Sequence, residues 1–493
     1  MLRKWGYLIA ALLASAVLAI LASTPPSPNG LDTPADQFSS ARAMEDVRII
    51  SERPHPTGSE ENAKVRNYLA GRMNVMGMEV SLGASKLNER SLARLNRWSG
   101  EEKTEQTIYN VIGVLPGRNR TLPAILLMAH HDTVWGSPGA ADDTAGVAAI
   151  LEIIRALKVD GLQQRDIIVL FTDGEEVGLQ GAVNFFNVNP LHETIGAVIN
   201  FEARGGGGVA SLFQTSADNG DAARLFARAV KEPSASSLST FVYSILPNDT
   251  DLTPALEKDY VSYNIANLGG AEYYHSPKIT ADALSEGTLQ HLGSQGLDLT
   301  RALLSSDLLP ANSPDRVFFD LFGLFTIIYA PLWGWVFIVL AALCFAIPVK
   351  GGFDLKAALF AGLRMAGFFG AGGLLLYLIN RLSGHGAAAD YYDRLAAIPA
   401  LEVAALSLSL ALFFSFFGTV KPGANERLGF ALPLFVIAIL GQAFAPTAAY
   451  FLPLALLLTG LACWGLNRWP RNALANIFAV LLSAIVLGYM LGL

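Results

Sequence analysis

The chain has 493 residues, of which 52% are hydrophobic and 16% are charged, and its formal net charge is −7. Such an apolar composition argues against an ordinary soluble protein, and the negative charge argues against a nucleic-acid partner. The two cysteines, Cys344 and Cys463, both lie in the apolar C-terminal part. The rest of the chain therefore has no disulfide, no thiol nucleophile and no thiolate zinc site.

Charge-free apolar runs occur at the N-terminus and after about residue 315. A helix needs about 20 apolar residues to cross the hydrocarbon core of a bilayer. Residues 5–23 meet this length, and we interpret them as a membrane anchor, with a cleaved signal peptide as the alternative. The later runs are 321–349, 365–380, 403–420, 428–467 and 472–493. Because 428–467 is long enough for two spans, we expect six C-terminal spans and about seven transmembrane helices in total.

The positions of Lys and Arg between the runs predict the topology. With a cytoplasmic N-terminus, the cytoplasmic connections hold Lys350, Lys356, Lys421, Arg427, Arg468 and Arg471. The opposite loop, 381–400, offsets its arginines with Asp390 and Asp393. Residues 24–315 are therefore expected outside the cytoplasm. The composition fits a bacterial inner membrane with a periplasmic domain; a vacuolar or endoplasmic reticulum membrane with a lumenal domain is the alternative.

The region between the anchor and the C-terminal runs reads as a linker and an α/β domain. Residues 24–42 are the linker, and an amphipathic helix is predicted over 60–77. Four apolar runs then alternate with helical patterns: 108–115, 124–129, 167–171 and 197–201. Runs that are apolar at every position are typical of parallel strands buried on both faces. We predict an α/β domain over 43–312, followed by an all-α transmembrane domain over 317–493.

Acidic and imidazole side chains follow these predicted strands. In an open α/β sheet the ligand site lies beyond the carboxyl ends of the strands, so such side chains converge there. Imidazole and carboxylate groups are metal ligands, and their number favours two metals that share one carboxylate. The residues concerned are His130, Asp132, Asp142, Asp143, Glu175, Glu176 and Glu202, with His275 further along the chain.

The spacing of these residues suggests a role for each of them at a metal site. His130 and Asp132 are two apart on an extended segment, so Asp132 is placed to orient a metal-bound His130. Asp142 lies in a short turn and can bridge two ions. One member of the Glu175–Glu176 pair can bind metal while the other polarises a water. Taken singly, each element has a structural alternative, such as a helix N-cap for the paired aspartates; the ordered combination favours the metal site.

Five stretches resemble the signatures of the di-zinc aminopeptidases of metallopeptidase family twenty-eight. They are HHD (130–132), PGAADDTAGVAAILE (138–152), TDGEEVGLQGA (172–182), INFEARGGGG (199–208) and YYHSPKITAD (273–282). The resemblance covers about residues 43–303 and implies a mixed, largely parallel sheet flanked by helices. The glycine run, NDTDLT at 248–253 and the apolar C-terminal half resemble a membrane-bound branch of this family.

The resemblance also implies roles for individual residues. One zinc would be held by His130, Asp142 and Glu202, and the other by Asp142, Glu176 and His275, giving two Zn²⁺ per chain. Glu175 would be the general base, Asp132 would support His130, and the peptide bond between Asp142 and Asp143 would be cis. Most members of the family have aspartate where this chain has Glu202. Tyr243 is a further residue that could help to hold the oxyanion.

We therefore expect a membrane-anchored di-zinc metallopeptidase, an aminopeptidase with peptide substrates, embedded in a lipid bilayer. Two alternatives remain at this point. The first is a single-zinc enzyme of the glutaminyl cyclase kind, against which the retained His130 and Glu202 weigh. The second is a receptor or assembly module without catalysis, against which the complete ligand set weighs. The sequence does not indicate the oligomeric state.

Overall fold

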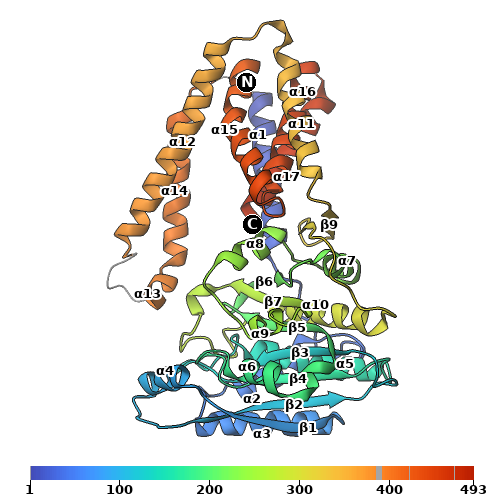
Figure 1. The fold of residues 1–493 in the computed structure, drawn as a ribbon. Coiled ribbons are helices and arrows are strands. Elements are labelled where there is room, and N and C mark those ends of the chain that lie inside the picture. The colour runs from blue at the N-terminus through green and yellow to red at the C-terminus, as the bar shows by residue number, and fades with distance from the viewer. Residues whose placement is uncertain (1, 385–390, 421, 471, 493) are drawn as a thin grey trace. The chain divides into compact units, whose positions relative to one another are not determined.

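The computed structural model describes residues 2–384, 391–420, 422–470 and 472–492. The chain divides into two compact units (Figure 1). The α/β unit comprises Thr24–Ile328, and the helical unit comprises the residues up to Ser23 together with those from Tyr329 onward. The division falls after Ser23 and after Ile328.

The α/β unit is built on a seven-stranded sheet with the order β1-β2-β4-β3-β5-β7-β6. The strands are β1 (Glu79–Lys86), β2 (Thr107–Leu115), β3 (Ala124–His130), β4 (Ile167–Thr172), β5 (Ile195–Ala203), β6 (Gly207–Thr215) and β7 (Val261–Gly269). The four central strands β4, β3, β5 and β7 are parallel, whereas β1, β2 and β6 pair antiparallel. The expected mixed, largely parallel sheet is confirmed.

One strand differs from the prediction. The run 108–115, expected to be parallel to the others, forms β2 and pairs antiparallel with β4. The segment between β2 and β3 is too short to contain a crossover helix, so the chain cannot return to start a parallel strand. The strand is nevertheless largely buried, which is why its composition resembles that of a parallel strand.

Helices cover both faces of the sheet (Figure 1). The helices of this unit are α2 (Ser40–Ile50), α3 (Glu60–Val75), α4 (Glu89–Ser99), α5 (Thr144–Val159), α6 (Gln180–Val188), α7 (Gly220–Ala229), α8 (Ser237–Ile245), α9 (Thr253–Leu256) and α10 (Glu286–Ser305), with short 3₁₀ turns at Pro190–Thr194 and Ala271–Tyr273. Ile125 and Leu127 of β3 pack in the core that includes α5, α2 and α10. Leu126 and Met128 pack in the second core with α6 and α9. Alternate residues thus enter different cores, which explains the continuous apolar pattern.

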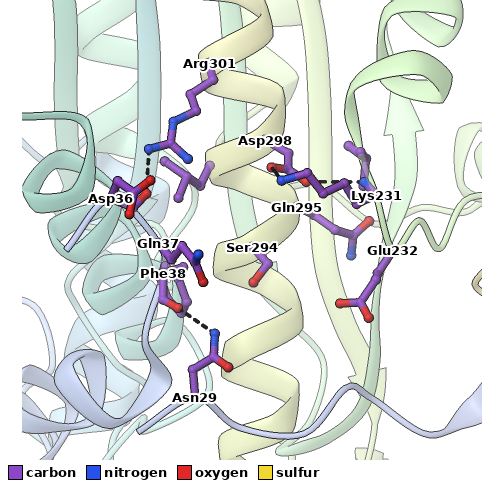
Figure 2. Close-up of a pocket in the computed structure, with 12 residues that line it drawn as sticks. Asn29, Asp36, Gln37, Phe38, Lys231, Glu232, Ser294, Gln295, Asp298 and Arg301 are labelled. Carbon is purple, nitrogen blue, oxygen red and sulfur yellow. Dashed lines mark hydrogen bonds and ion pairs between the residues drawn. The ribbon is translucent and has the colours of Figure 1, made fainter. Parts of the chain in front are cut away.

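The segment expected to be a linker packs on the α/β unit. Gln290 of α10 accepts hydrogen bonds from the main-chain N–H groups of Asn29 and Ser40, at 3.1 and 2.9 Å. Figure 2 shows a pocket of about 440 Å³ between this segment and α10. In it, Arg301 donates to the carbonyl of Asp36. These contacts hold the segment on the α/β unit.

The helical unit contains six helices that are long and apolar enough to cross a membrane within the described ranges. The helices of this unit are α1 (Leu2–Ser23), α11 (Trp333–Ala346), α12 (Leu355–Leu382), α13 (Tyr391–Ala396), α14 (Ile398–Phe417), α15 (Ala424–Phe444), α16 (Phe451–Arg468) and α17 (Ala473–Gly492), with a 3₁₀ turn at Ile347–Gly351. The stretch Trp333–Val349 is also apolar but shorter than the six. With it, the apolar helices agree with the expected number of about seven, and 428–467 is divided between α15 and α16.

The first C-terminal span begins later than predicted. The run that starts at residue 321 was expected to be helical throughout, but its first part lies in a two-stranded sheet of β8 (Val317–Asp320) and β9 (Thr326–Tyr329). Gly323 adopts a φ of 73°, and its N–H donates to Asp320, which closes the turn between the strands. Lys421, Arg471 and Asp390, which contributed to the predicted topology, lie outside the described residues.

Candidate metal centre

The predicted ligands meet at the carboxyl ends of the parallel strands. His130 is the last residue of β3, and Glu202 lies near the end of β5. Glu176 lies in the turn that follows β4, and His275 comes shortly after β7. Asp142 lies just before α5, whose N-terminus is capped by the Asp143 side chain. The topology therefore brings five separate segments to one edge of the sheet.

His130, Asp142 and Glu202 form the first cluster. Each offers one ligand atom, and these atoms all lie within 4.8 Å of one another. His130 Nε2 is 3.0 Å from Asp142 Oδ1. All three side chains are buried. This set has the one nitrogen and two oxygen ligands that the family resemblance implied for the first zinc.

Asp142, Glu176 and His275 form the second cluster, again with ligand atoms within 4.8 Å of one another. His275 Nε2 lies 3.0 Å from Asp142 Oδ2 and 3.2 Å from Glu176 Oε1. Asp142 thus turns one carboxylate oxygen toward His130 and the other toward His275. A carboxylate placed in this way has the geometry of a bridging ligand. The peptide bond that follows it, Asp142–Asp143, is cis.

The donor set fits zinc. A neutral imidazole nitrogen and a carboxylate oxygen at 3.0 Å repel each other unless a proton or a metal ion lies between them. Glu202 Oε1 is buried and has no hydrogen-bond partner among the described residues, which is costly unless a cation compensates it. Nitrogen and oxygen ligands from histidine and carboxylates are those of catalytic zinc sites.

The protonation states reflect the same crowding of charge. Burial alone would raise the pKa of Asp142, but the hydrogen bonds from His130 and His275 outweigh it and lower the pKa below its ordinary value. Burial raises the pKa of Glu202 to about 8, opposed by His130 and reinforced by the charge of Asp142. A group of carboxylates that resists ionisation in the absence of a cation is a typical metal-binding environment.

Glu175 is more exposed than the three carboxylate residues Asp142, Glu176 and Glu202. It can approach His130 and Glu176 with one oxygen, yet its side chain is only partly buried. Desolvation raises its pKa well above the ordinary value, and the neighbouring Glu176 and Glu202 charges add to the shift. Glu175 is therefore accessible from outside the cluster and able to hold a proton.

Asp132 contacts His130 mainly through its main chain. Its carbonyl oxygen lies 2.9 Å from His130 Nδ1, whereas its carboxylate Oδ1 is 3.8 Å away. The carboxylate instead accepts the main-chain N–H groups of Glu175 and Glu176, at 3.1 and 3.3 Å. The Thr57 hydroxyl also donates to it, at 2.9 Å. Asp132 therefore fixes the His130 ring and the glutamate turn together.

The sequence reasoning did not identify three residues that lie at the site. Thr57 comes from the segment just before α3, and no motif of the sequence marks it. Asp251, within the NDTDLT stretch, is buried and accepts a hydrogen bond from Thr172, which pairs with His130 across β3 and β4. Burial raises the pKa of Asp251 to about 7. Its only sequence signal was the match of NDTDLT to the membrane-bound branch.

Tyr274 is the third such residue. Its ring stacks on the His275 imidazole with the ring centroids 3.7 Å apart. Burial raises its pKa, and the charges of Asp142 and Glu176 reinforce the shift. Tyr243 of α8, which the sequence analysis singled out, packs edge-on against Phe213 at 4.7 Å. Burial and the charge of Glu202 raise its pKa. Both phenols therefore keep their protons beside the cluster.

The parallel strand edge with its two histidine–carboxylate clusters defines a metallopeptidase-type α/β domain. Comparison with known proteins makes the assignment specific, because residues 110–300 match peptidase family M28. The chain therefore contains a peptidase family M28 domain, as the motifs predicted.

The curated relatives include a vacuolar membrane protease and an endoplasmic reticulum metallopeptidase. The chain is 32% identical over 321 residues to a vacuolar membrane protease of Eremothecium gossypii, covering 61% of this chain and 31% of the relative. It is 30% identical over 296 residues to endoplasmic reticulum metallopeptidase 1 of Homo sapiens, covering 57% and 32%. The chain thus spans about a third of the length of these relatives. Together with the apolar helices, they identify a membrane protein.

Among solved structures, a zinc aminopeptidase from Bacillus subtilis has a TM-score of 0.45 at 15% identity, with 57% of this chain and 99% of that chain covered. A glutaminyl cyclase from Porphyromonas gingivalis has a TM-score of 0.43 at 18% identity, with 54% and 99% covered.

Proposed function

We propose that this protein is a membrane-anchored di-zinc aminopeptidase that hydrolyses N-terminal peptide bonds outside the cytoplasm. The observation that supports it most directly is the position of Asp142, whose two oxygens face different histidines. A single-metal site would need only one of these contacts. The M28 match supports the reaction class.

The residues of the site divide into ligands and proton carriers. His130, Asp142 and Glu202 would hold one zinc, and Asp142, Glu176 and His275 the other. When bound, the two ions would supply Lewis-acid polarisation of the peptide carbonyl and lower the pKa of the attacking water. Glu175 takes the proton of that water and delivers it to the leaving amine. Its accessible position and raised pKa suit both steps.

The phenol groups of Tyr243 and Tyr274 would stabilise the oxyanion that forms from the peptide carbonyl. Tyr243 and Tyr274 keep their protons, because their pKa values are raised. Each can donate a hydrogen bond to the oxyanion that forms when water adds to the carbonyl. Tyr274 is held by its stack on His275, which keeps its hydroxyl close to the second cluster.

Metal content and one substitution test the proposal. The full chain, purified in detergent, should hold about two zinc ions, and Glu175→Gln should retain them. The kcat of Glu175→Gln on aminoacyl reporters should fall by about 10²- to 10⁴-fold, the usual contribution of a general base. Glu193→Gln, at an exposed position, is the matched control and should behave as wild type.

The same measurements separate the alternatives. A single zinc with cyclisation of N-terminal glutamine would favour the glutaminyl cyclase reaction. Equal turnover by wild type and Glu175→Gln, or less than one zinc per chain, would overturn the proposal.

A further inference from the structure

Arg204 is a basic side chain at the rim of an acidic site. It comes directly after β5, two residues beyond Glu202. Its main-chain N–H donates to the carbonyl of Asn267 at 2.8 Å. This hydrogen bond ties the end of β5, which carries Glu202, to the end of β7, which leads to His275.

The glycine run after Arg204 makes this attachment close. A Cβ atom at Gly205 would lie 2.4 Å from the carbonyl oxygen of Gly269, and one at Gly269 would lie 2.8 Å from that of Gly207. The two backbones can approach in this way only because side chains are absent. The side chain of Asn267 also donates to the Gly205 carbonyl. The position of Arg204 relative to the metal ligands is therefore fixed by backbone packing.

The guanidinium group is held one aromatic ring away from a predicted zinc ligand. Arg204 Cζ lies 4.7 Å from the centroid of the Tyr274 ring. Tyr274 in turn stacks on His275. Stacking occupies the flat face of a guanidinium, and its N–H donors lie at the edge, where they match the two oxygens of a carboxylate.

The Arg204 guanidinium can bind an anionic group of a substrate at this site. Glu175, Glu202 and Asp251 are acidic side chains and offer no positive charge to an anionic group of a substrate. Arg204 is half-buried beside them, and its charge acts on both Tyr243 and Tyr274. One residue of extended chain spans about 3.3–3.6 Å. The 4.7 Å between the guanidinium carbon and the Tyr274 ring centroid is of the same order, which suits a carboxylate carried by the residue that follows the scissile bond.

We propose that Arg204 binds a substrate carboxylate next to the scissile bond and makes the enzyme selective for substrates that carry one. The carboxylate is the free C-terminus of a dipeptide or the acidic side chain of the second residue of a longer peptide. This inference rests on the proposed peptidase function. It adds the chemical class of substrate that the enzyme prefers.

The test pairs a change in the enzyme with a change in the substrate. Wild type and Arg204→Gln would be assayed as full chains on Leu-Leu and its C-terminal amide, and on Leu-Asp-amide and Leu-Asn-amide. Wild type should hydrolyse one acidic member about 10- to 100-fold better in kcat/KM, mainly through KM, as expected for a charged hydrogen bond. Arg204→Gln should lose that preference while it hydrolyses the neutral member at the wild-type rate.

The two substrate pairs distinguish the two possible carboxylates. A preference within the first pair identifies the C-terminus as the bound carboxylate, and one within the second pair identifies the side chain. Arg204→Lys should retain part of the preference, and Arg228→Gln, an exposed arginine on α7, should retain all of it.

Equal hydrolysis of acidic and neutral members by wild type would overturn the inference, and so would an equal loss on both in Arg204→Gln. The equal loss would assign Arg204 to the support of Tyr274. Absence of turnover on all four substrates would instead reject the proposed function.

Discussion

The carboxylate of Asp132 accepts the main-chain N–H of Glu175 at 3.1 Å. The proposed general base is therefore positioned through its backbone by a residue that also contacts His130 through its carbonyl group. Asp132 thus contacts His130, a proposed zinc ligand, through its main chain, and its buried carboxylate holds the turn that carries the proposed base and the proposed ligand Glu176.

Substitution of Asp132 should therefore affect catalysis more than substrate binding. In Asp132→Asn, one carboxylate oxygen becomes an amide nitrogen, which cannot accept the N–H groups of the glutamate turn. We expect kcat to fall by about 10- to 100-fold, the usual effect of losing a residue that orients metal ligands. Steady-state kinetics with zinc analysis measure this. Asp282→Asn, at an exposed position, is the control, and wild-type kcat in Asp132→Asn would contradict the role.

The sequence identified the edge of the site because each strand places its last residues there. His130, Glu176 and Glu202 follow continuous apolar runs, so their convergence depended only on the strands being parallel. Local pattern carries this information, since strand period and turn position are properties of neighbouring residues.

The residues that the sequence missed depend on long-range contacts. Thr57 reaches Asp132 from a turn far earlier in the chain, and nothing in its neighbourhood marks that contact. Tyr274 matters because it stacks on His275, which depends on the fold of the segment after β7. Likewise, the antiparallel direction of β2 could not be read from its composition, because burial on both faces produces the same apolar run in either direction.

Zinc binding should release protons near neutral pH. Burial raises the pKa of Glu202 to about 8, so without metal this carboxyl is mostly protonated at pH 7, yet it must ionise to bind zinc. Zinc affinity should therefore rise as the pH increases from 6 toward 8. Titration calorimetry in buffers of different ionisation enthalpy measures the proton release. Glu202→Gln should release fewer protons and hold one zinc less than wild type, and an affinity that does not change over this range would contradict the prediction.

His55 should make the folded protein sensitive to acid. Its complete burial lowers its pKa to about 4, whereas the unfolded chain binds the proton near the ordinary value of 6.5. The stabilisation from a neutral His55 is thus complete above pH 6.5, and it is lost as the pH falls toward 4. The loss is about 3 kcal/mol from the pKa difference.

Thermal unfolding of the full chain in detergent, monitored from pH 4 to 7, tests this prediction. His55→Asn keeps a donor for the Arg53 carbonyl that His55 Nδ1 contacts but cannot be protonated. The difference in melting temperature between wild type and variant should shrink or reverse on acidification. A difference that is constant with pH would show that His55 does not govern the acid sensitivity.

The predicted topology can be tested by cysteine labelling, because the only native cysteines, Cys344 and Cys463, can be replaced by alanine. Glu101 of the α/β unit and Lys356 at the start of α12 are both exposed. In intact cells a membrane-impermeant maleimide should label Glu101→Cys, whereas Lys356→Cys should react only after permeabilisation, because the positive-inside rule places it in the cytoplasm. The reverse pattern would place the metal centre in the cytoplasm. The peptides available to it would then be those of the cytoplasm rather than of an outer compartment or lumen, so this measurement decides which substrate pool the Arg204 selectivity acts on.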